Sequence, residues 1–572
     1  MEYLLIVAIA SLVVTAIAKR RGWQSELIVL LLAATVSFVP NFPELSIDPH
    51  LLLEIVLPPL LFSSAKNLDR TKFNRLKKSI LSLGFVLVIV TAIVVAVIVN
   101  AISSQLSFTV CLILGAIVSP PDAVSTVAIG KKMHLPDRVM SILTGESLIN
   151  DAAALTLFSF ALSLHESNSA GFAVQLFFFT TAIGIGVGFA FAQLMKYIRR
   201  ILKDAALVSV FTMISPFLIY IIAEQAGGSG VLAVVTAGFS LQQSTLRSDY
   251  VTRMQEKSLW HAIDTLFETF VFAYIGLNAK NVIMDVANET LIDSFHAVLL
   301  AFIVLALVIV TRIIFVKTMY FMNGRLNEMT VNRYEKFRKL FQEANFDTAS
   351  PYYRFLNDPK RKRRYEQAKR AYEQAKHSIE SSKKRGNESN IVAWSGMRGV
   401  VTLATAFAIP ISYGGGVTID ARTTVQFIAL VVTVGTLVLQ ASTLPYVIKR
   451  SLGEKVLLKE EKKDYAKAVK ILNASTMNTI SKLDLKDDTK ETERRIIRAY
   501  RALAQQGDIV RTDPESGEEE DIRISDIIHS ITENQREDLL AAVDDCIISQ
   551  DTADSLLTHL DLRQASINTL GI

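Results

Sequence analysis

Cysteine is almost absent from this 572-residue chain, which contains only Cys111 and Cys546. Two thiols, one in an apolar run and one in a polar tail, exclude the disulfide framework that is typical of small secreted domains. We therefore expect the parts of the chain outside any membrane to face a reducing cytoplasm. The glycine-rich segment 227–230 has no Lys-Ser or Lys-Thr pair after it, so it is not a typical phosphate-binding loop.

Charged residues are scarce in two long parts of the chain, 1–320 and 391–448, and apolar residues make up 51% of the whole. This composition is typical of a polytopic membrane protein. Charge gathers instead in 321–390 and 449–572, which we interpret as a basic cytoplasmic insert and a helical cytoplasmic regulatory tail. The net charge of +5 therefore belongs to loops and tails, and it does not indicate a nucleic-acid partner.

The apolar parts contain about thirteen candidate membrane spans, and the short or polar ones need shielding by their neighbours. Roughly the first eleven lie in 1–320 and the last two in 391–448. Together they form the predicted membrane domain of an all-α polytopic protein. Their centres lie near residues 10, 32, 58, 89, 118, 151, 182, 214, 235, 268, 306, 401 and 436.

Basic residues are nearly absent from alternate loops between these spans. Lys280 and Arg422 are the only lysine or arginine residues in the loops 40–50, 100–107, 165–171, 224–229, 278–292 and 411–423. The positive-inside rule therefore predicts an N-terminus outside the cell membrane, with the insert and the tail in the cytoplasm. The first apolar run has no basic segment before it and no cleavage site after it, so we expect a retained span and not a signal peptide.

Three predicted spans contain residues that interrupt a helix. The third holds Pro58 and Pro59, the fifth holds Pro120 and Pro121, and the twelfth holds the Gly-Met-Arg-Gly segment 396–399. An interruption at membrane depth persists only where protein or a water-filled cavity satisfies the freed backbone groups, and transporters use such groups to bind ions. For the third span, the alternative that proline is simply common in membrane helices remains open.

The sixth predicted span places two carboxylates at membrane depth, Glu146 and Asp151, with Ser147 and Asn150 beside them. A carboxylate there costs roughly 2.5–3.5 kcal/mol, and such residues mark ion or proton paths. Ser147 and Asp151 are four residues apart and share a helix face. Removal from water favours the protonated form of a carboxyl group, so Asp151 is predicted to bind either a proton or a hard monovalent cation.

Arg398 is a strong cation near the middle of the twelfth span, and an unpaired guanidinium at that depth would be very costly. We therefore expect an ion pair between Arg398 and Glu146 that holds two interrupted helices in register and leaves Asp151 free to bind its ligand. In the alternative, the Arg398 side chain extends to the cytoplasmic edge of the membrane.

Four motifs make the membrane part resemble the sodium/proton exchangers of the first monovalent cation:proton antiporter family. They are GESLIND at 145–151, GMRGV at 396–400, LPPLL at 57–61 and ETFVF at 268–272. The resemblance covers about 1–320 and 391–448. It implies thirteen helices in inverted repeats, a core of crossed, interrupted helices, a dimerisation unit, and alternating access by an elevator-like movement.

The resemblance also implies roles for individual residues. Asp151 would be the carboxylate that binds cation and proton, and Ser147 a side-chain ligand one turn earlier. Asn150 would be the neutral partner associated with one-for-one electroneutral exchange. The acid of the family's fifth span corresponds to Asp122, where the preceding Pro121 can offer only its backbone carbonyl. Ser63 departs from the family, whose members often have an acid at that position.

The predicted function is secondary antiport of sodium, or also lithium, against protons. Potassium/proton exchange remains an alternative, because the motif does not define the size of the site. A cation channel would need a continuous polar pore or repeated filter sequence, and neither is present. An intramembrane aspartyl protease built on Asp122 and Asp151 lacks its Gly-x-Gly-Asp context, so we expect no enzymatic activity. We expect no cofactor beyond the transported ions.

The expected partners are membrane lipids and a second copy of the chain. The basic cluster Lys360–Arg364 is predicted to attract anionic lipid, because such clusters beside a membrane contribute about 1 kcal/mol per charge. Binding of nucleic acid is the competing interpretation of this cluster, and its position beside a membrane favours lipid. The sequence does not identify a ligand for the regulatory tail.

Overall fold

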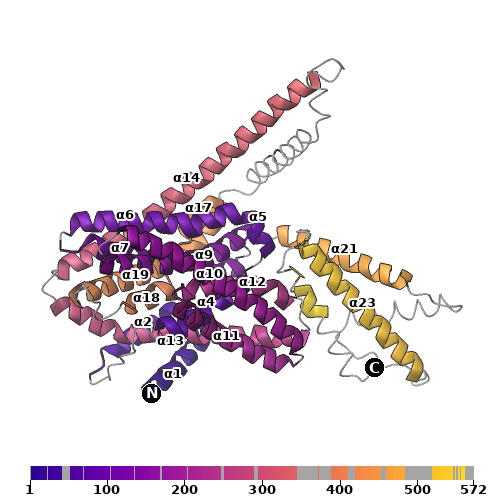
Figure 1. Cartoon of the computed structure of the whole chain (residues 1–572), viewed down its shortest axis with the longest axis horizontal. Helices are drawn as coiled ribbons and strands as arrows, with labels where there is room; N and C mark the ends of the chain where they lie inside the picture. Colours follow the sequence, from indigo (N-terminus) through magenta and orange to yellow (C-terminus); the bar gives the residue numbers. More distant parts are fainter. Residues whose placement is uncertain are drawn as a thin grey trace.

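The computed structural model describes residues 2–40, 52–246, 250–288, 294–343, 388–409, 419–452, 459–482 and 518–544, with gaps of one or two residues inside some of these ranges, and short pieces at 372, 376 and 548–560. Helices account for all regular structure in these residues, and no strand occurs in them. Figure 1 shows a bundle of helices from which α14 projects, with α21 and α23 beside it.

The first half of the bundle contains the elements up to α10. They are α1 (Glu2–Arg21), α2 (Ser25–Ser37), η1 (Leu52–Val56), α4 (Leu57–Lys66), α5 (Arg70–Leu81), η2 (Ser82–Val86), α6 (Leu87–Ile102), α7 (Phe108–Val118), α8 (Val124–Lys132), α9 (Asp137–Ser167) and α10 (Ala170–Ile201).

The second half continues through α19, and two further helices lie in the C-terminal tail. These elements are α11 (Ala205–Gln225), α12 (Gly230–Leu246), α13 (Tyr250–Asn288), α14 (Ser294–Glu343), α17 (Glu388–Trp394), α18 (Val400–Phe407), α19 (Ile419–Leu452), α21 (Lys459–Lys482) and α23 (Glu518–Asp544). Every predicted span centre falls within one of the helices from α1 to α19.

Seven helical segments of the described chain are long and apolar enough to cross a membrane, and α2, α7 and α12 supply shorter apolar helices. Helix α6 is rich in valine and isoleucine, which are only moderate helix formers in water. In lipid, a helix is nonetheless favoured because it satisfies every backbone polar group within the segment. The chain is thus a multi-pass membrane protein, and the number of about thirteen spans stays a prediction.

Two of the three predicted interruptions are present as breaks between helices. Helix α7 ends at Val118 and α8 begins at Val124, while α17 ends at Trp394 and α18 begins at Val400. The third differs, because the π-helix η1 runs directly into α4. Pro58 and Pro59 lie in the first turn of α4, where a missing backbone donor costs little. The change of helix type therefore takes the place of a break.

Helix α14 does not end where we placed the start of the insert, at 321. It comprises 50 residues and continues to Glu343, which corresponds to about 75 Å at 1.5 Å per residue. The hydrocarbon core of a bilayer is only about 30 Å thick. The C-terminal part of α14 therefore extends well beyond the other membrane helices, as Figure 1 shows.

A buried polar cluster joins four helices at the end of α4. The Glu256 carboxylate on α13 pairs with the Lys66 ammonium on α4 at 2.7 Å and with the Arg199 guanidinium on α10 at 3.1 Å. It also accepts a hydrogen bond of 3.1 Å from the Thr212 hydroxyl on α11. A buried carboxylate needs such partners, so the cluster links α4, α10, α11 and α13.

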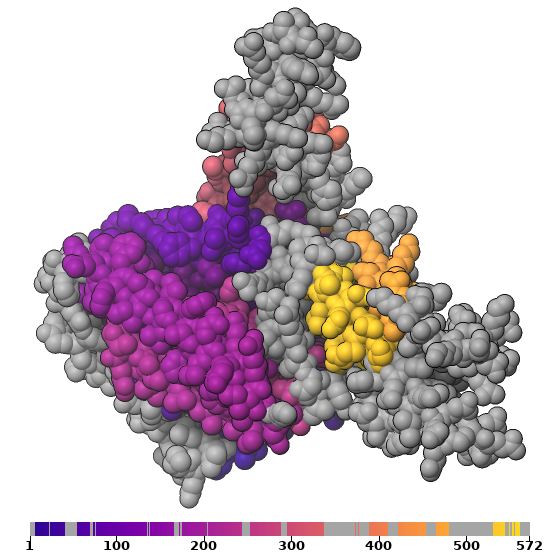
Figure 2. Space-filling view, turned by 45° about the vertical axis from the view of Figure 1, so that its right-hand side comes forward, coloured from indigo at the N-terminus to yellow at the C-terminus, as the bar shows by residue number. Residues whose placement is uncertain are grey.

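The described part of the tail is helical and has an apolar core of its own. Helices α21 and α23 pack through buried residues that include Ala468, Leu539 and Val543. The Gln535 amide donates a hydrogen bond of 2.7 Å to the Thr476 hydroxyl. Figure 2 shows these helices, in orange and yellow, gathered in one block. The basic cluster Lys360–Arg364 lies outside the described residues.

Candidate functional site

The two broken helices meet at their interruptions. The backbone N–H of Asp122, between α7 and α8, donates a hydrogen bond of 2.6 Å to the carbonyl oxygen of Met397, between α17 and α18. Each break leaves backbone groups without helical partners, and this contact satisfies one group from each. The crossing of these two segments therefore brings the Asp122 carboxylate and the Gly-Met-Arg-Gly segment 396–399 together.

Helix α9 supports the break between α7 and α8 with two polar side chains. The Asn150 amide donates a hydrogen bond of 2.8 Å to the Pro121 carbonyl oxygen. The Ser147 hydroxyl accepts one of 3.3 Å from the N–H of Ala123. Both side chains therefore hold backbone of the break, a role that spacing along α9 alone did not reveal. The amide oxygen of Asn150, Oδ1, is buried and has no hydrogen-bond partner among the described residues.

Arg398 satisfies carbonyl groups that the breaks leave free. Its Nε donates to the Val118 carbonyl oxygen at 2.9 Å and its Nη2 to that of Ser119 at 3.2 Å. Its Nη1 donates to the carbonyl oxygen of Gly396. A cation at the C-terminal end of α7 also suits the helix dipole. Arg398 is only 2% exposed, so its side chain does not extend to the membrane edge.

The predicted pair between Glu146 and Arg398 is wrong in its cation. Arg312 of α14 donates two hydrogen bonds to the Glu146 carboxylate, of which the one from Nη2 to Oε2 measures 3.1 Å. The same Nη2 donates to the Val392 carbonyl oxygen on α17 at 3.0 Å. Glu146 and Arg312 are 1% and 2% exposed. The signal that we missed was a lone arginine in the apolar run 297–316.

The two remaining acids of the site lie near the crossing. The Asp122 carboxylate accepts a hydrogen bond of 2.9 Å from the N–H of Val124, in the first turn of α8. Asp151 follows Asn150 on α9, is partly exposed, and has no hydrogen-bond partner among the described residues. The two carboxylates are close enough to repel each other electrostatically. One added positive charge would relieve this repulsion.

Gly399 makes room for the Asp122 carboxylate, because a Cβ atom at position 399 would overlap it. We expect Gly399→Ala to displace Asp122 and to slow transport by at least about tenfold, since displacements of about 1 Å can be this costly at a reacting group. The measurement is the initial rate of cation-dependent proton flux in proteoliposomes with equal protein content.

Gly186→Ala on α10 is the matched control for this substitution. A Cβ atom at position 186 would meet no other atom within 4 Å, so the control should transport at the wild-type rate. Equal rates for the two alanine variants would show that the close approach of Gly399 to Asp122 has no functional consequence.

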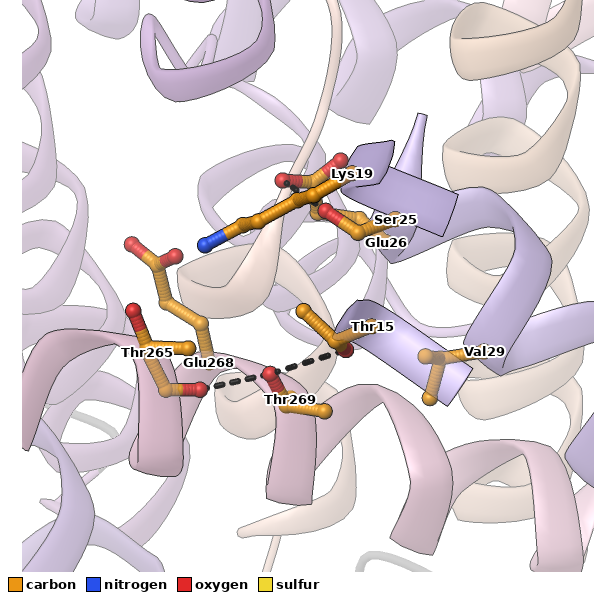
Figure 3. Close-up of a pocket in the computed structure, with 8 residues that line it drawn as sticks. All are labelled: Thr15, Lys19, Ser25, Glu26, Val29, Thr265, Glu268 and Thr269. Carbon is orange, nitrogen blue, oxygen red and sulfur yellow. Dashed lines mark hydrogen bonds between the residues drawn. The ribbon is translucent and has the colours of Figure 1, made fainter. Parts of the chain in front are cut away.

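A polar pocket lies where α1, α2 and α13 meet, and Figure 3 shows the residues that line it. The Lys19 side chain reaches across the pocket toward the Glu268 carboxylate. Glu268 also interacts electrostatically with Asp122 and Glu26. The Thr15 and Thr269 hydroxyls are joined by a hydrogen bond of 3.4 Å. The pocket thus adds further charge to the electrostatic environment of Asp122.

Comparison with known proteins identifies a family. A family model described as "Sodium/hydrogen exchanger, transmembrane" matches residues 6–337. The sodium proton antiporter MjNhaP1 from Methanocaldococcus jannaschii has a similar structure, with a TM-score of 0.57 and 17% sequence identity over 79% of this chain and 98% of that protein. Together with the two broken helices, this likeness confirms the predicted fold class.

Similar sequences extend over much of the chain. The "Sodium, potassium, lithium and rubidium/H(+) antiporter" of Bacillus pumilus is 24% identical over 480 residues, which cover 82% of this chain and 64% of that protein. The "Na(+)/H(+) antiporter ApNhaP" of Aphanothece halophytica is 30% identical over 289 residues, 48% of this chain and 54% of that protein. The chain therefore spans less than two thirds of the length of these relatives.

Proposed function

The chain belongs to the sodium/hydrogen exchanger family, and from this premise we propose that it is a secondary antiporter that exchanges sodium ions for protons across the cell membrane. The observation that carries the proposal is the crossing of two broken helices, fixed by the hydrogen bond from the Asp122 N–H to the Met397 carbonyl oxygen. Beside it lies Asp151, whose carboxylate has no hydrogen-bond partner in the described part of the chain. Interrupted helices that cross in this way are a common means of binding ions in transporters.

The proposed chemistry is competition for Asp151. When Asp151 and Asp122 are both ionised, their mutual repulsion favours the uptake of one positive charge. A proton on Asp151 removes the negative charge that a sodium ion needs, so the carboxylate holds one or the other. Arg398 and Arg312 are committed to backbone carbonyls and to Glu146, and they do not neutralise Asp151.

In the proposed cycle Asp151 alone exchanges its bound ion, while Asp122 keeps its charge throughout, and this gives one-for-one exchange. Asn150 cannot ionise, and its amide holds the Pro121 carbonyl, so it adds no second titrating group beside Asp151. The net charge moved per cycle is then zero. In this proposal, alternating access exposes the site to each side in turn, and Ser147, Asn150 and Asp122 arrange the ligands around Asp151. The Glu146–Arg312 pair holds α9 against α14 and α17.

Potassium/proton exchange is the second candidate. The observation that favours it is the name of the Bacillus pumilus relative, which includes sodium, potassium, lithium and rubidium. Oxygen ligands from carboxylate, hydroxyl and carbonyl groups suit all alkali-metal ions, and cavity size and rigidity select among them.

The orientation that we propose has the N-terminus outside and the insert and tail in the cytoplasm, and the assembly is a homodimer.

The experiment is a flux assay on the purified chain in proteoliposomes with an imposed pH gradient. We expect added Na⁺ to dissipate the gradient, Li⁺ to act similarly, and K⁺ to act weakly. The rate should not change when a membrane potential is imposed. A preparation that dissipates no gradient with any of these ions would contradict the antiporter proposal, and a rate that depends on the potential would contradict the one-for-one stoichiometry.

A further inference from the structure

A pocket away from the crossing opens between α14, α17 and α19. Its polar residues include Lys317 on α14, Asn390 on α17 and Arg450 on α19, and two aromatic residues, Trp394 and Tyr446, also line it. Lys317 and Arg450 are exposed. None of the described residues that line this pocket is acidic, so these residues present two positive charges and no negative one.

The partners of these two cations are neutral. The Lys317 ammonium donates to the side-chain oxygens of Asn390 and Ser389, and the Arg450 guanidinium donates to the Tyr446 hydroxyl at 3.0 Å. Among the described residues, neither cation forms an ion pair. These contacts orient the two side chains without neutralising them, which leaves a site ready for an anion.

The pocket lies at the depth of a membrane interface. Lys317 directly follows the apolar run 297–316 of α14, and Arg450 lies just beyond the apolar part of α19. Tryptophan and tyrosine are enriched at that depth, and Trp394 and Tyr446 occupy it here. Ile313 and Val447 supply apolar lining beside the cations. An amphiphile with an anionic head and an apolar tail matches this combination of surfaces.

The pocket is also connected to the candidate site. Helix α17 forms one wall, and its Val392 carbonyl accepts a hydrogen bond from Arg312, the partner of Glu146. The chain after α17 enters the break that contacts Asp122 through Met397. A ligand that joins Lys317 to Arg450 would therefore hold α14 and α19 together with α17, the helix that leads into the contact between Met397 and Asp122.

We propose that this pocket binds the phosphate headgroup of an anionic phospholipid, with the acyl chains lying against the apolar lining. The lipid bridges Lys317 and Arg450 and stabilises the packing of α17 between α14 and α19. This binding does not depend on the proposed exchange activity, so a failure of either can be recognised separately. Basic pockets between membrane helices recognise lipid headgroups in this way.

The first experiment measures thermal unfolding of the full chain in detergent with added phosphatidylglycerol or phosphatidylcholine. We expect phosphatidylglycerol to raise the melting temperature more than phosphatidylcholine does. In the variant Lys317→Gln with Arg450→Gln, the affinity for phosphatidylglycerol should fall by on the order of tenfold, because two headgroup contacts are removed. Glycerol phosphate and inorganic phosphate should produce no comparable shift.

The matched control is Lys131→Gln with Lys449→Gln. Both lysines are exposed and lie outside the pocket, and the change in charge is the same. The control should retain the response to phosphatidylglycerol. Equal loss in both double variants would show a general effect of charge and overturn the proposal, as would a full response to inorganic phosphate alone.

A second measurement avoids charge variants in case these do not fold. The chain has three tryptophans, so Trp23→Phe with Trp260→Phe leaves Trp394 as the fluorescent reporter in the pocket. Brominated phosphatidylglycerol should quench Trp394 at least about twofold more than brominated phosphatidylcholine at the same mole fraction, because the headgroup enriches the anionic lipid there. Equal quenching by the two lipids would overturn the proposal.

Discussion

Replacement of Asp151 by asparagine is expected to reduce exchange to the background of empty liposomes, a loss of at least about a hundredfold. An amide has nearly the same size as the carboxyl group but carries no negative charge and takes up no proton near neutral pH. It therefore removes both halves of the proposed competition at once. The measurement is sodium-dependent dissipation of a pH gradient, with protein content and melting temperature matched to those of the wild type.

Asp204→Asn is the control for the same chemical change. The Asp204 carboxylate caps α11 by accepting hydrogen bonds from the N–H groups of Ala206 and Leu207, and asparagine is an equally good cap. This variant should exchange at the wild-type rate. If Asp151→Asn also retained full exchange, the assignment of the site would fail, although the proposal of antiport would survive.

The pair between Glu146 and Arg312 is expected to have the largest effect on stability. Both side chains are nearly inaccessible, and removal of one partner leaves an uncompensated buried charge, which costs about 3–5 kcal/mol. Arg312→Met alone should therefore lower the melting temperature in detergent markedly. Glu146→Leu combined with Arg312→Met should restore much of the loss, because it leaves no buried charge unpaired.

The corresponding pair of variants with Arg398→Met tests whether the partner is assigned correctly. Arg398 donates to the carbonyl groups of Val118, Ser119 and Gly396, which remain buried when the guanidinium is removed. Glu146→Leu should therefore not rescue Arg398→Met. Rescue of Arg398→Met and none of Arg312→Met would restore the pairing that we expected from the sequence and contradict the structure.

The helices and the two broken spans could be predicted from the sequence because their causes are local. A run of apolar residues specifies a membrane helix, and Pro120 with Pro121 cannot continue α7 because their nitrogens have no hydrogen to donate. The same reasoning overestimated the tendency of Pro58 and Pro59 to break the third span. They lie in the first turn of α4, after a π-helix, where the missing donors need not break the chain.

The partner of Glu146 could not be derived from one helix at a time. Arg312 and Arg398 are both buried, and both are far from Glu146 in the sequence. Only the packing of α9 against α14 and α17 decides which of the two arginines pairs with Glu146. Arg398 was the better candidate while its carbonyl partners were unknown. The roles of Ser147 and Asn150 in holding the break at 119–123 likewise depend on tertiary contacts.

The length of α14 was missed for a different reason. The charged residues after Lys317 end the apolar run, and we placed the insert where the membrane signal ends. Charged and polar residues such as lysine, glutamate and arginine are good helix formers, so the helix continues beyond the membrane to Glu343. Hydropathy reports where a helix leaves the lipid, and it does not report where the helix ends.

The central claim is that one carboxylate, Asp151, holds either a sodium ion or a proton. Its most direct test is the apparent KM for Na⁺ measured as a function of pH on the side where Na⁺ binds. Competition at one site predicts that KM rises by about tenfold for each unit by which pH falls in the acidic range, with the maximal rate unchanged at saturating Na⁺. A KM that stays constant over two pH units while the maximal rate falls would contradict the account.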